Sequence, residues 1–90
     1  MKRVHVYISG RVQGVCFRAI AQQKAKGFNL TGWVRNMSDG RVEAVFEGED
    51  DNVDKMLNWC HVGPPAAQVE KVLTEEEPDT GELRNFSVMY

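Results

Sequence analysis

The 90-residue sequence predicts a single α+β domain over residues 1–90, in which two helices cover one face of an antiparallel sheet. Several short segments alternate apolar and polar residues, which is typical of strands with one buried face. Two longer segments repeat apolar residues at helical spacing. The order along the chain is strand, helix, strand, strand, helix, strand. This is a split βαβ arrangement, which places both helices on the same face of the sheet.

The first strand and the first helix are predicted on either side of a loop that contains two glycines. Val4, Val6 and Ile8 alternate with polar residues and indicate the strand. The helix is expected to begin at Phe17 and to end at Gly27, because glycine commonly terminates helices. Its apolar face consists of Phe17, Ile20, Ala21 and Ala25.

A β-hairpin is predicted next. Residues 30–35 are rich in Thr, Trp and Val, which favour strands, and residues 36–40 (Asn-Met-Ser-Asp-Gly) are typical of a turn. Residues 41–47 alternate again and form the second arm. The apolar side of this arm consists of Val42, Ala44 and Phe46.

The second helix has a clear apolar stripe: Val53, Met56, Leu57 and Cys60. It is expected to begin near the acidic residues at positions 50, 51 and 54, which the helix dipole stabilises, and to stop at Gly63-Pro64-Pro65. The acidic residues could instead form a Ca²⁺ or Mg²⁺ site. Their spacing lacks the glycine and the terminal glutamate of a calcium loop, so we interpret them as helix-stabilising charges.

A fourth strand is predicted from about Ala67 to Thr74. Its apolar side would carry Val69 and Leu73. Val72 breaks strict alternation, and a β-bulge would accommodate it.

The C-terminal region is predicted to return to the sheet. Residues 75–81 include three consecutive glutamates and are expected to form a solvated connection. Phe86, Val88 and Tyr90 alternate with other residues up to the chain end, which predicts a short final strand.

Composition limits the classes of protein to which the chain can belong. A net charge of −2 argues against a nucleic-acid partner, and no apolar run is long enough for a membrane span. Met1–Arg3 leads into the first strand without a signal-peptide pattern, so we expect a cytoplasmic protein. Cys16 and Cys60 form no disulfide framework and are not spaced with His5 or His61 as metal ligands are. We therefore expect a monomer without metal, cofactor or membrane partner.

The most informative segment is Ile8–Arg18, which passes from a strand through a loop into the start of a helix. Backbone amides of such a loop can converge, and a helix N-terminus carries about half a positive charge, so together they can bind an anion. Arg18 adds a planar guanidinium group, which can donate hydrogen bonds to two phosphate oxygens at once. The segment therefore predicts a site for a phosphoryl group.

The spacing of this loop excludes several known phosphate-binding motifs. Gly14 is followed by Val-Cys, whereas a P-loop requires Gly-Lys-Ser/Thr. Three residues separate Gly10 from Gly14, which does not fit the Gly-x-Gly-x-x-Gly pattern of dinucleotide sites. Cys16 and Arg18 are only two positions apart, which leaves no room for the loop of a cysteine phosphatase. The segment therefore suits a small anion and carries no nucleotide signature.

Two segments of the chain resemble the signatures of the acylphosphatase family. Ile8–Arg18 reads Ile-Ser-Gly-Arg-Val-Gln-Gly-Val-Cys-Phe-Arg and fills every fixed position of the first signature, and Gly32–Gly48 resembles the second. The resemblance covers nearly the whole chain and implies one acylphosphatase-like domain with a ferredoxin-like sandwich and a short last strand. It also implies hydrolysis of small acyl phosphates to a carboxylate and inorganic phosphate.

The resemblance assigns roles to individual residues. Arg18 matches the phosphate-binding arginine of the family, and Asn36 matches the asparagine that orients the attacking water. The amides that would complete the phosphate cradle belong to Val12, Gln13, Gly14, Val15, Cys16, Phe17 and Arg18. An acyl phosphate releases a carboxylate whose conjugate acid has a pKa of about 4, so a general acid is not required. Direct attack of the water without a metal ion follows from this assignment.

Four details of the predicted site extend this assignment. Gln13 is expected to shape the loop without taking part in chemistry. Cys16 stands where many family members carry glycine. Arg35 should point to the opposite face of the sheet by strand alternation. The C-terminal carboxylate of Tyr90 could form a salt bridge with Arg18.

Simpler interpretations exist for the same residues. Arg18 could pair with a surface acid, and Asn36 could be only a turn residue. The domain could bind phosphate or carbamoyl phosphate without catalysis, as related domains do inside larger maturation proteins, although the free-standing length argues against this. An RNA-binding protein could stack bases on Tyr7 and Trp33, but the net charge and the missing Lys/Arg-Gly-Phe/Tyr motif disfavour it. Both signatures together favour the enzyme.

Overall fold

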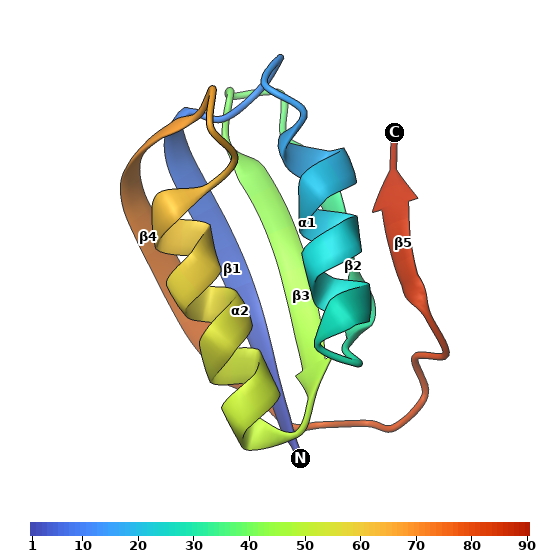
Figure 1. Ribbon diagram of the computed structural model, residues 1–90. Coiled ribbons are helices and arrows are strands. Elements are labelled where there is room, and N and C mark those ends of the chain that lie inside the picture. The colour runs from blue at the N-terminus through green and yellow to red at the C-terminus, as the bar shows by residue number, and fades with distance from the viewer.

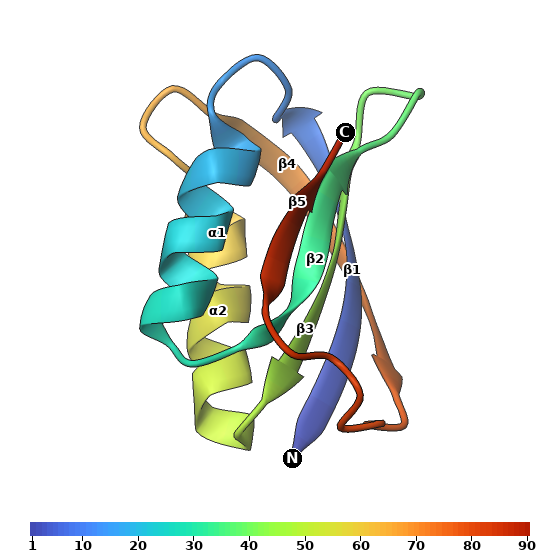
Figure 2. The ribbon, with the colours of Figure 1, turned by 90° about the vertical axis from the view of Figure 1, so that its right-hand side faces the viewer.

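The computed structural model describes all 90 residues and consists of a five-stranded sheet with two helices on one face (Figure 1). The elements in chain order are β1 (Lys2–Arg11), α1 (Phe17–Gly27), β2 (Thr31–Asn36), β3 (Val42–Gly48), α2 (Asp50–Val62), β4 (Gln68–Glu77) and β5 (Phe86–Met89). Figure 2 shows both helices on the same side of the sheet. The predicted α+β sandwich is confirmed. Neither helix has the length and apolar composition needed to cross a membrane.

The strands are ordered β4-β1-β3-β2-β5 across the sheet. All pairs among β1 to β4 are antiparallel, as expected. β5 is the exception, because it pairs parallel with β2 at the edge. In Figure 1 the connection after β4 runs past the lower end of the sheet to the opposite edge, so β5 runs in the same direction as β2.

The core lies between the sheet and the helices. Alternate side chains of β1 and β3 face the apolar stripes of α1 and α2, as the sequence predicts. The buried apolar residues of these four elements include Val4, Val6, Ile8, Phe17, Ala21, Ala25, Val42, Ala44, Phe46, Val53, Met56 and Cys60. Burial raises the pKa of the Cys60 thiol to about 12, so this cysteine is an unreactive core residue.

β4 is longer than the sequence predicts. The three glutamates expected in a solvated connection lie in the strand, where Glu77 pairs with Arg3 and Glu75 with His5 of β1. The prediction of a loop at residues 75–77 is therefore wrong. The backbone of these residues pairs with Arg3, Val4 and His5 of β1, and the Glu77 carboxylate has cationic partners there. Favourable cross-strand pairs outweigh the weak strand propensity of glutamate.

The predicted β-bulge is present in β4. Ser9 pairs with Lys71 and Gly10 with Val69, so Glu70 is the extra residue. The bulge places both Val69 and Val72 against the core. Leu73 was expected on the same side, but it is 44% exposed.

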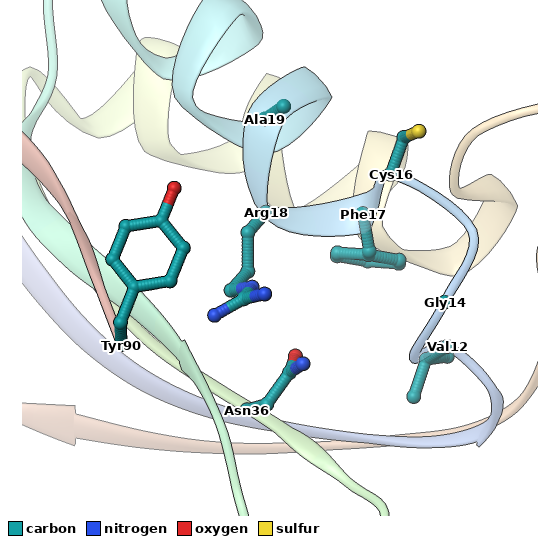
Figure 3. A pocket seen from close by; sticks show the side chains of 8 residues that line it. All are labelled: Val12, Gly14, Cys16, Phe17, Arg18, Ala19, Asn36 and Tyr90. Atoms are coloured by element: carbon teal, nitrogen blue, oxygen red, sulfur yellow. The ribbon is translucent and has the colours of Figure 1, made fainter.

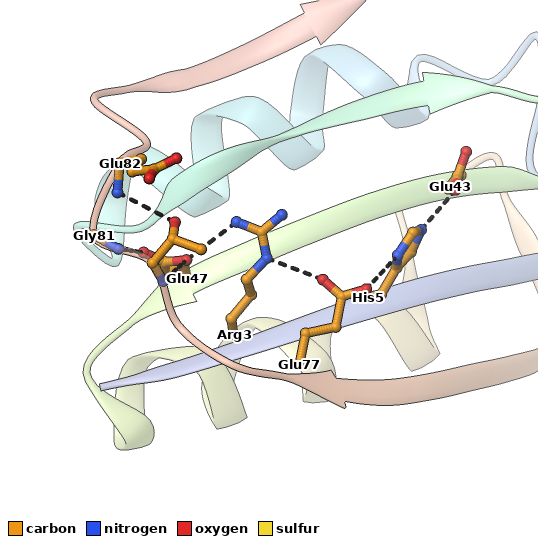
Figure 4. A network of polar contacts seen from close by, with 8 residues as sticks. Arg3, His5, Glu43, Glu47, Glu77, Gly81 and Glu82 are labelled. Carbon is orange, nitrogen blue, oxygen red and sulfur yellow. Dashed lines mark hydrogen bonds and ion pairs between the residues drawn. The ribbon is translucent and has the colours of Figure 1, made fainter.

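The face of the sheet without helices is covered by its own side chains. On β3, Glu43, Val45 and Glu47 are buried although no helix lies over them. Arg3 and His5 of β1 pack over this strand and form ion pairs with it (Figure 4). Arg35 of β2 also forms an ion pair with it. This face also contains Tyr7, whose ring stacks on His5 at a centroid distance of 4.8 Å.

His5 is the centre of the ion-pair network on this face. Its Nδ1 lies 2.9 Å from a Glu77 oxygen and its Nε2 lies 2.6 Å from a Glu43 oxygen (Figure 4). Burial disfavours the charged ring, but the hydrogen bonds to Glu77 and Glu43 outweigh it and raise the pKa of His5 above its ordinary value of 6.5. The pKa of Glu77 is lowered by its bonds to His5 and Arg3.

Glu47 links this network to the connection between β4 and β5. Its carboxylate lies 3.3 Å from Arg3 Nη1 and accepts the Gly81 backbone N–H at 2.9 Å (Figure 4). Burial opposes ionisation of Glu47, yet the backbone N–H groups of Gly81 and Thr80 and the Arg3 guanidinium lower its pKa. A buried carboxylate with these partners anchors the segment that leads to β5.

Candidate active site

A single pocket lies where the loop after β1, the start of α1, the end of β2 and the C-terminus meet (Figure 3). It is lined by Val12, Gly14, Cys16, Phe17, Arg18, Ala19, Asn36 and Tyr90. The cavity volume is about 150 Å³. A single water molecule needs only about 10–15 Å³ of such volume, so the cavity has room for a phosphoryl group. Neither in this pocket nor elsewhere is a group of three or more His, Cys, Asp or Glu residues arranged to hold a metal ion.

Gly10 was expected in the loop, but it lies near the end of β1, where it pairs with Val69 and makes a close backbone contact with β4. This residue has φ 121°, and a Cβ added to it would lie 2.2 Å from the Gln68 carbonyl oxygen. Only glycine lets the end of β1 pass so close to the bulged strand β4. The contact sets the direction in which the chain leaves the sheet toward α1.

The N-terminus of α1 has no capping side chain and no acidic residue in its first turn. The first helical bond beyond the loop runs from the Ile20 N–H to the Cys16 carbonyl at 3.1 Å. The amides of residues 17–19 therefore have no acceptor within the helix. At α2, by contrast, Asp50 and Asp51 supply negative charge to the first turn. The start of α1 is thus free to receive an external anion.

Cys16 immediately precedes α1 and has φ 62° and ψ 24°, the left-handed conformation. Such a backbone favours glycine, which gives a physical reason for the glycine that the resemblance implies for many acylphosphatases at this position. The residue is exposed, and its sulfur points away from the Arg18 guanidinium (Figure 3). The thiol therefore does not fill the cavity.

Arg18 extends from the first turn of α1 into the pocket (Figure 3). It makes no ion pair, so the interpretation as a partner of a surface acid does not hold. Its Nη1 donates to the Met89 carbonyl at 3.3 Å, and its Cζ lies 4.6 Å from the centre of the Tyr90 ring. The guanidinium is held by the chain end while its charge stays uncompensated.

The predicted salt bridge between Arg18 and the C-terminal carboxylate is absent. The ring of Tyr90, and not its carboxylate, contacts the guanidinium. Tyr90 lies beyond the end of β5 and is fully exposed, so its carboxylate keeps its hydration. An exposed ion pair contributes only about 0–1 kcal/mol, which is too little to impose the predicted geometry.

Asn36 is the last residue of β2 and pairs with Val42 at the base of the hairpin. Its side chain points into the pocket toward Arg18 (Figure 3). The Oδ1 atom is buried and has no hydrogen-bond partner. Leaving a buried acceptor unpaired costs about 1–3 kcal/mol, so this atom is suited to accept a bond from a bound water or ligand. Arg35 points to the opposite face, as predicted, and pairs with Glu43 there.

The predicted phosphate-binding residues are not all equivalent in the structure. Gln13 and Val15 do not line the pocket, and Gln13 donates instead to the Met37 and Arg41 carbonyls. Ala19 does line it, although sequence reasoning did not single it out. Ala19 follows Arg18 in the first turn of α1, and this position alone could have indicated that it lies at the pocket. The ring of Tyr90 could not be placed from its position in the sequence.

The fold and the pocket define a class of protein. It is a small α+β sandwich whose single cavity combines an uncapped helix N-terminus, an arginine without an acidic partner and a buried amide oxygen. Such a cavity is suited to a phosphoryl group and a water molecule.

Comparison with known proteins identifies the family within this class. The family model described as acylphosphatase matches residues 4–88. The acylphosphatase of Rubrobacter xylanophilus is 59% identical over 87 residues, which cover 97% of this chain and 79% of that protein. The acylphosphatase of Roseiflexus sp. (strain RS-1) is 57% identical over 90 residues, which cover 100% of this chain and 97% of that protein. The crystal structure of acylphosphatase from Bacillus subtilis matches with a TM-score of 0.96 at 33% identity and covers 100% of both chains.

The chain therefore belongs to the acylphosphatase family. It is an enzyme of this family, with acyl phosphates as its substrate class, and its sheet and helices have the ferredoxin-like arrangement. The resemblance of the two sequence signatures is thereby confirmed.

Proposed function

We propose that the pocket binds the phosphoryl group of a small acyl phosphate and that Arg18 and Asn36 are its catalytic residues. One observation carries the proposal: an arginine without an ion pair and a buried, unpartnered amide oxygen line the same small cavity at the start of α1. A structural arginine would have an acidic partner, and a turn asparagine would bond its own backbone. Neither residue does so here.

The phosphoryl group is held by charge and by backbone N–H groups. Backbone amides of the loop and of the first turn of α1 that face the pocket donate to its oxygens, and the Arg18 guanidinium donates two parallel hydrogen bonds. The Met89 carbonyl and the Tyr90 ring keep the guanidinium in the cavity before substrate arrives. Because the positive charge is already in place, little reorganisation is needed when charge develops on phosphorus.

The nucleophile in the proposed mechanism is a water molecule bound to Asn36. Its Oδ1 accepts a hydrogen bond from the water, which leaves a lone pair of the water directed at phosphorus. The water oxygen forms a bond to phosphorus while the bond between phosphorus and the carboxylate oxygen breaks. The bonding electron pair leaves with the carboxylate, and a phosphoryl oxygen takes the proton of the water. Arg18 and the loop amides supply the positive charge, so no metal ion is required.

Hydrolysis of acetyl phosphate and benzoyl phosphate in the presence of EDTA tests the proposal. We expect turnover that divalent cations do not increase. In ¹⁸O-enriched water, one labelled oxygen should appear in inorganic phosphate and none in the carboxylate, because the attack is at phosphorus. Phosphate binding without turnover would favour the non-catalytic alternative, and label in the carboxylate would exclude attack at phosphorus.

The cytoplasmic location and the monomeric state also belong to this proposal. Cys16 and Cys60 are free thiols, which supports a reducing compartment. The helix-free face of the sheet is already covered by its own side chains, which supports a monomer. Cell fractionation and light scattering of the purified protein test the two statements separately.

A further inference from the structure

The side chain of Gln13 leaves the phosphate loop and reaches the hairpin between β2 and β3. Its Nε2 lies 2.7 Å from the Met37 carbonyl oxygen and 3.0 Å from the Arg41 carbonyl oxygen. A carboxamide nitrogen carries two protons, and both are donated here. The two acceptors stand on opposite arms of the hairpin, where the Met37 N–H also donates to the Arg41 carbonyl at 2.8 Å.

These bonds act on the backbone next to Asn36. Met37 directly follows Asn36, and Arg41 directly precedes Val42, which is the cross-strand partner of Asn36. The Asn36 Oδ1 has no hydrogen bond that could fix its direction. Its position therefore depends on the backbone that carries it, and Gln13 holds that backbone at both arms of the hairpin.

We infer that Gln13 is a positioning residue that aligns Asn36 with the phosphoryl group, an inference that rests on the function proposed above. The contact joins the two parts of the mechanism directly. Gln13 belongs to the loop that binds phosphate. Its hydrogen bonds reach the hairpin that carries Asn36, the residue proposed to orient the water. A shift of one part moves the other, so the distance between phosphorus and water is set by this bridge.

Gln13→Leu tests the inference, because it keeps a similar volume and removes both donors. A misplacement of about 1 Å can cost about 100-fold in rate, so we expect kcat to fall by about 10- to 100-fold. KM and the inhibition constant of inorganic phosphate should change by less than about threefold, since Arg18 and the loop amides remain. Gln13→Glu, with the same shape and no donor, should lower kcat further because a carboxylate would face two carbonyl oxygens.

Gln22→Leu is the matched control. The Gln22 Nε2 also donates to a backbone carbonyl, that of Phe86 at 3.0 Å, but on the side of α1 that faces β5. Both leucine variants lose comparable hydrogen bonding, so similar decreases in Tm are expected. Only Gln13→Leu should lower kcat. Near-UV circular dichroism and assays well below each Tm ensure that folded protein is compared.

A double-mutant cycle with Asn36→Ala decides whether Gln13 acts through Asn36. Gln13→Leu should lower kcat in the wild-type background and change it less than about twofold in the Asn36→Ala background, because no amide remains to be aligned. Equal factors in both backgrounds would overturn the inference, and so would a raised phosphate inhibition constant with unchanged kcat. If Asn36→Ala has a lowered kcat and Gln13→Leu has the kcat of the wild type, only the inference about Gln13 fails. An Asn36→Ala enzyme with normal kcat would refute the proposed function and this inference with it.

Discussion

Replacing Cys16 with glycine is expected to stabilise the protein. The left-handed backbone at this position, with φ 62° and ψ 24°, costs a residue with a Cβ about 1–2 kcal/mol. Glycine avoids that cost but loses more backbone entropy on folding, which offsets about 0.5–1 kcal/mol. The difference spans about 0–1.5 kcal/mol, and we expect a net increase in the free energy of unfolding near its centre, about 0.7 kcal/mol.

Thermal and urea unfolding measure this gain. For a domain of this size, 1 kcal/mol shifts Tm by about 4–8 °C, so Cys16→Gly should raise Tm by about 3–6 °C. The urea midpoint should rise without a change in the m-value. Cys16→Ala is the matched control, because it removes the thiol and keeps the Cβ in the left-handed conformation. It should show little or no gain.

Two results would refute the reasoning. If the Tm of Cys16→Gly equals or falls below that of the wild type, the backbone at this position is not strained. If the glycine and alanine variants gain equally, the thiol and not the backbone is responsible. Asn29 provides a further comparison, since it also has a positive φ of 57°. Asparagine tolerates this conformation, so Asn29→Gly should gain less than Cys16→Gly.

Three other predictions concern the site and the ion-pair network. Arg18→Lys keeps the charge but loses the fork, so kcat/KM should fall by at least about tenfold and inhibition by inorganic phosphate should weaken; unchanged inhibition would contradict the role of the guanidinium. Asn36→Ala should lower kcat by about 10²- to 10³-fold while inorganic phosphate still inhibits, as steady-state kinetics would show. His5 has a raised pKa, so its contribution to stability is complete below pH 6.5 and is lost as the pH rises through that raised pKa. The pKa values of Glu43 and Glu77 are lowered, so these residues contribute to stability above pH 4.5 and lose this contribution as the pH falls. The Tm of wild type should therefore decrease relative to His5→Gln above the His5 pKa, and parallel Tm profiles from pH 5 to 9 would contradict this.

Much of the fold follows from local patterns in the sequence. The bounds of α1 agree with the apolar spacing and with the terminal Gly27, and α2 begins at Asp50, where acidic residues favour a helix start. Gly14 lies in the loop that leads into α1, as expected, whereas Gly10 belongs to β1. These signals involve residues within a few positions of one another, so the sequence carries them directly.

The errors concern contacts between distant residues. The sequence predicts that Glu77 lies in a solvated loop. In the structure it lies in β4, where its carboxylate accepts a hydrogen bond from Arg3, 74 positions away. The parallel pairing of β5 depends on where the connection after β4 crosses the sheet. The sequence also could not show that the Tyr90 ring would contact Arg18 in place of the carboxylate.

The sequence by itself determined the order of the helices and strands, and through its resemblance to the family signatures it pointed to Arg18 and Asn36 as candidate site residues. Only the tertiary structure decided that Arg18 has no acidic partner, that the Asn36 amide oxygen is buried without a hydrogen bond, and that Gln13 grips the hairpin beside it. The physical reason is that residue types and spacings report local backbone preferences. Whether a polar atom is paired depends on what the folded chain brings next to it.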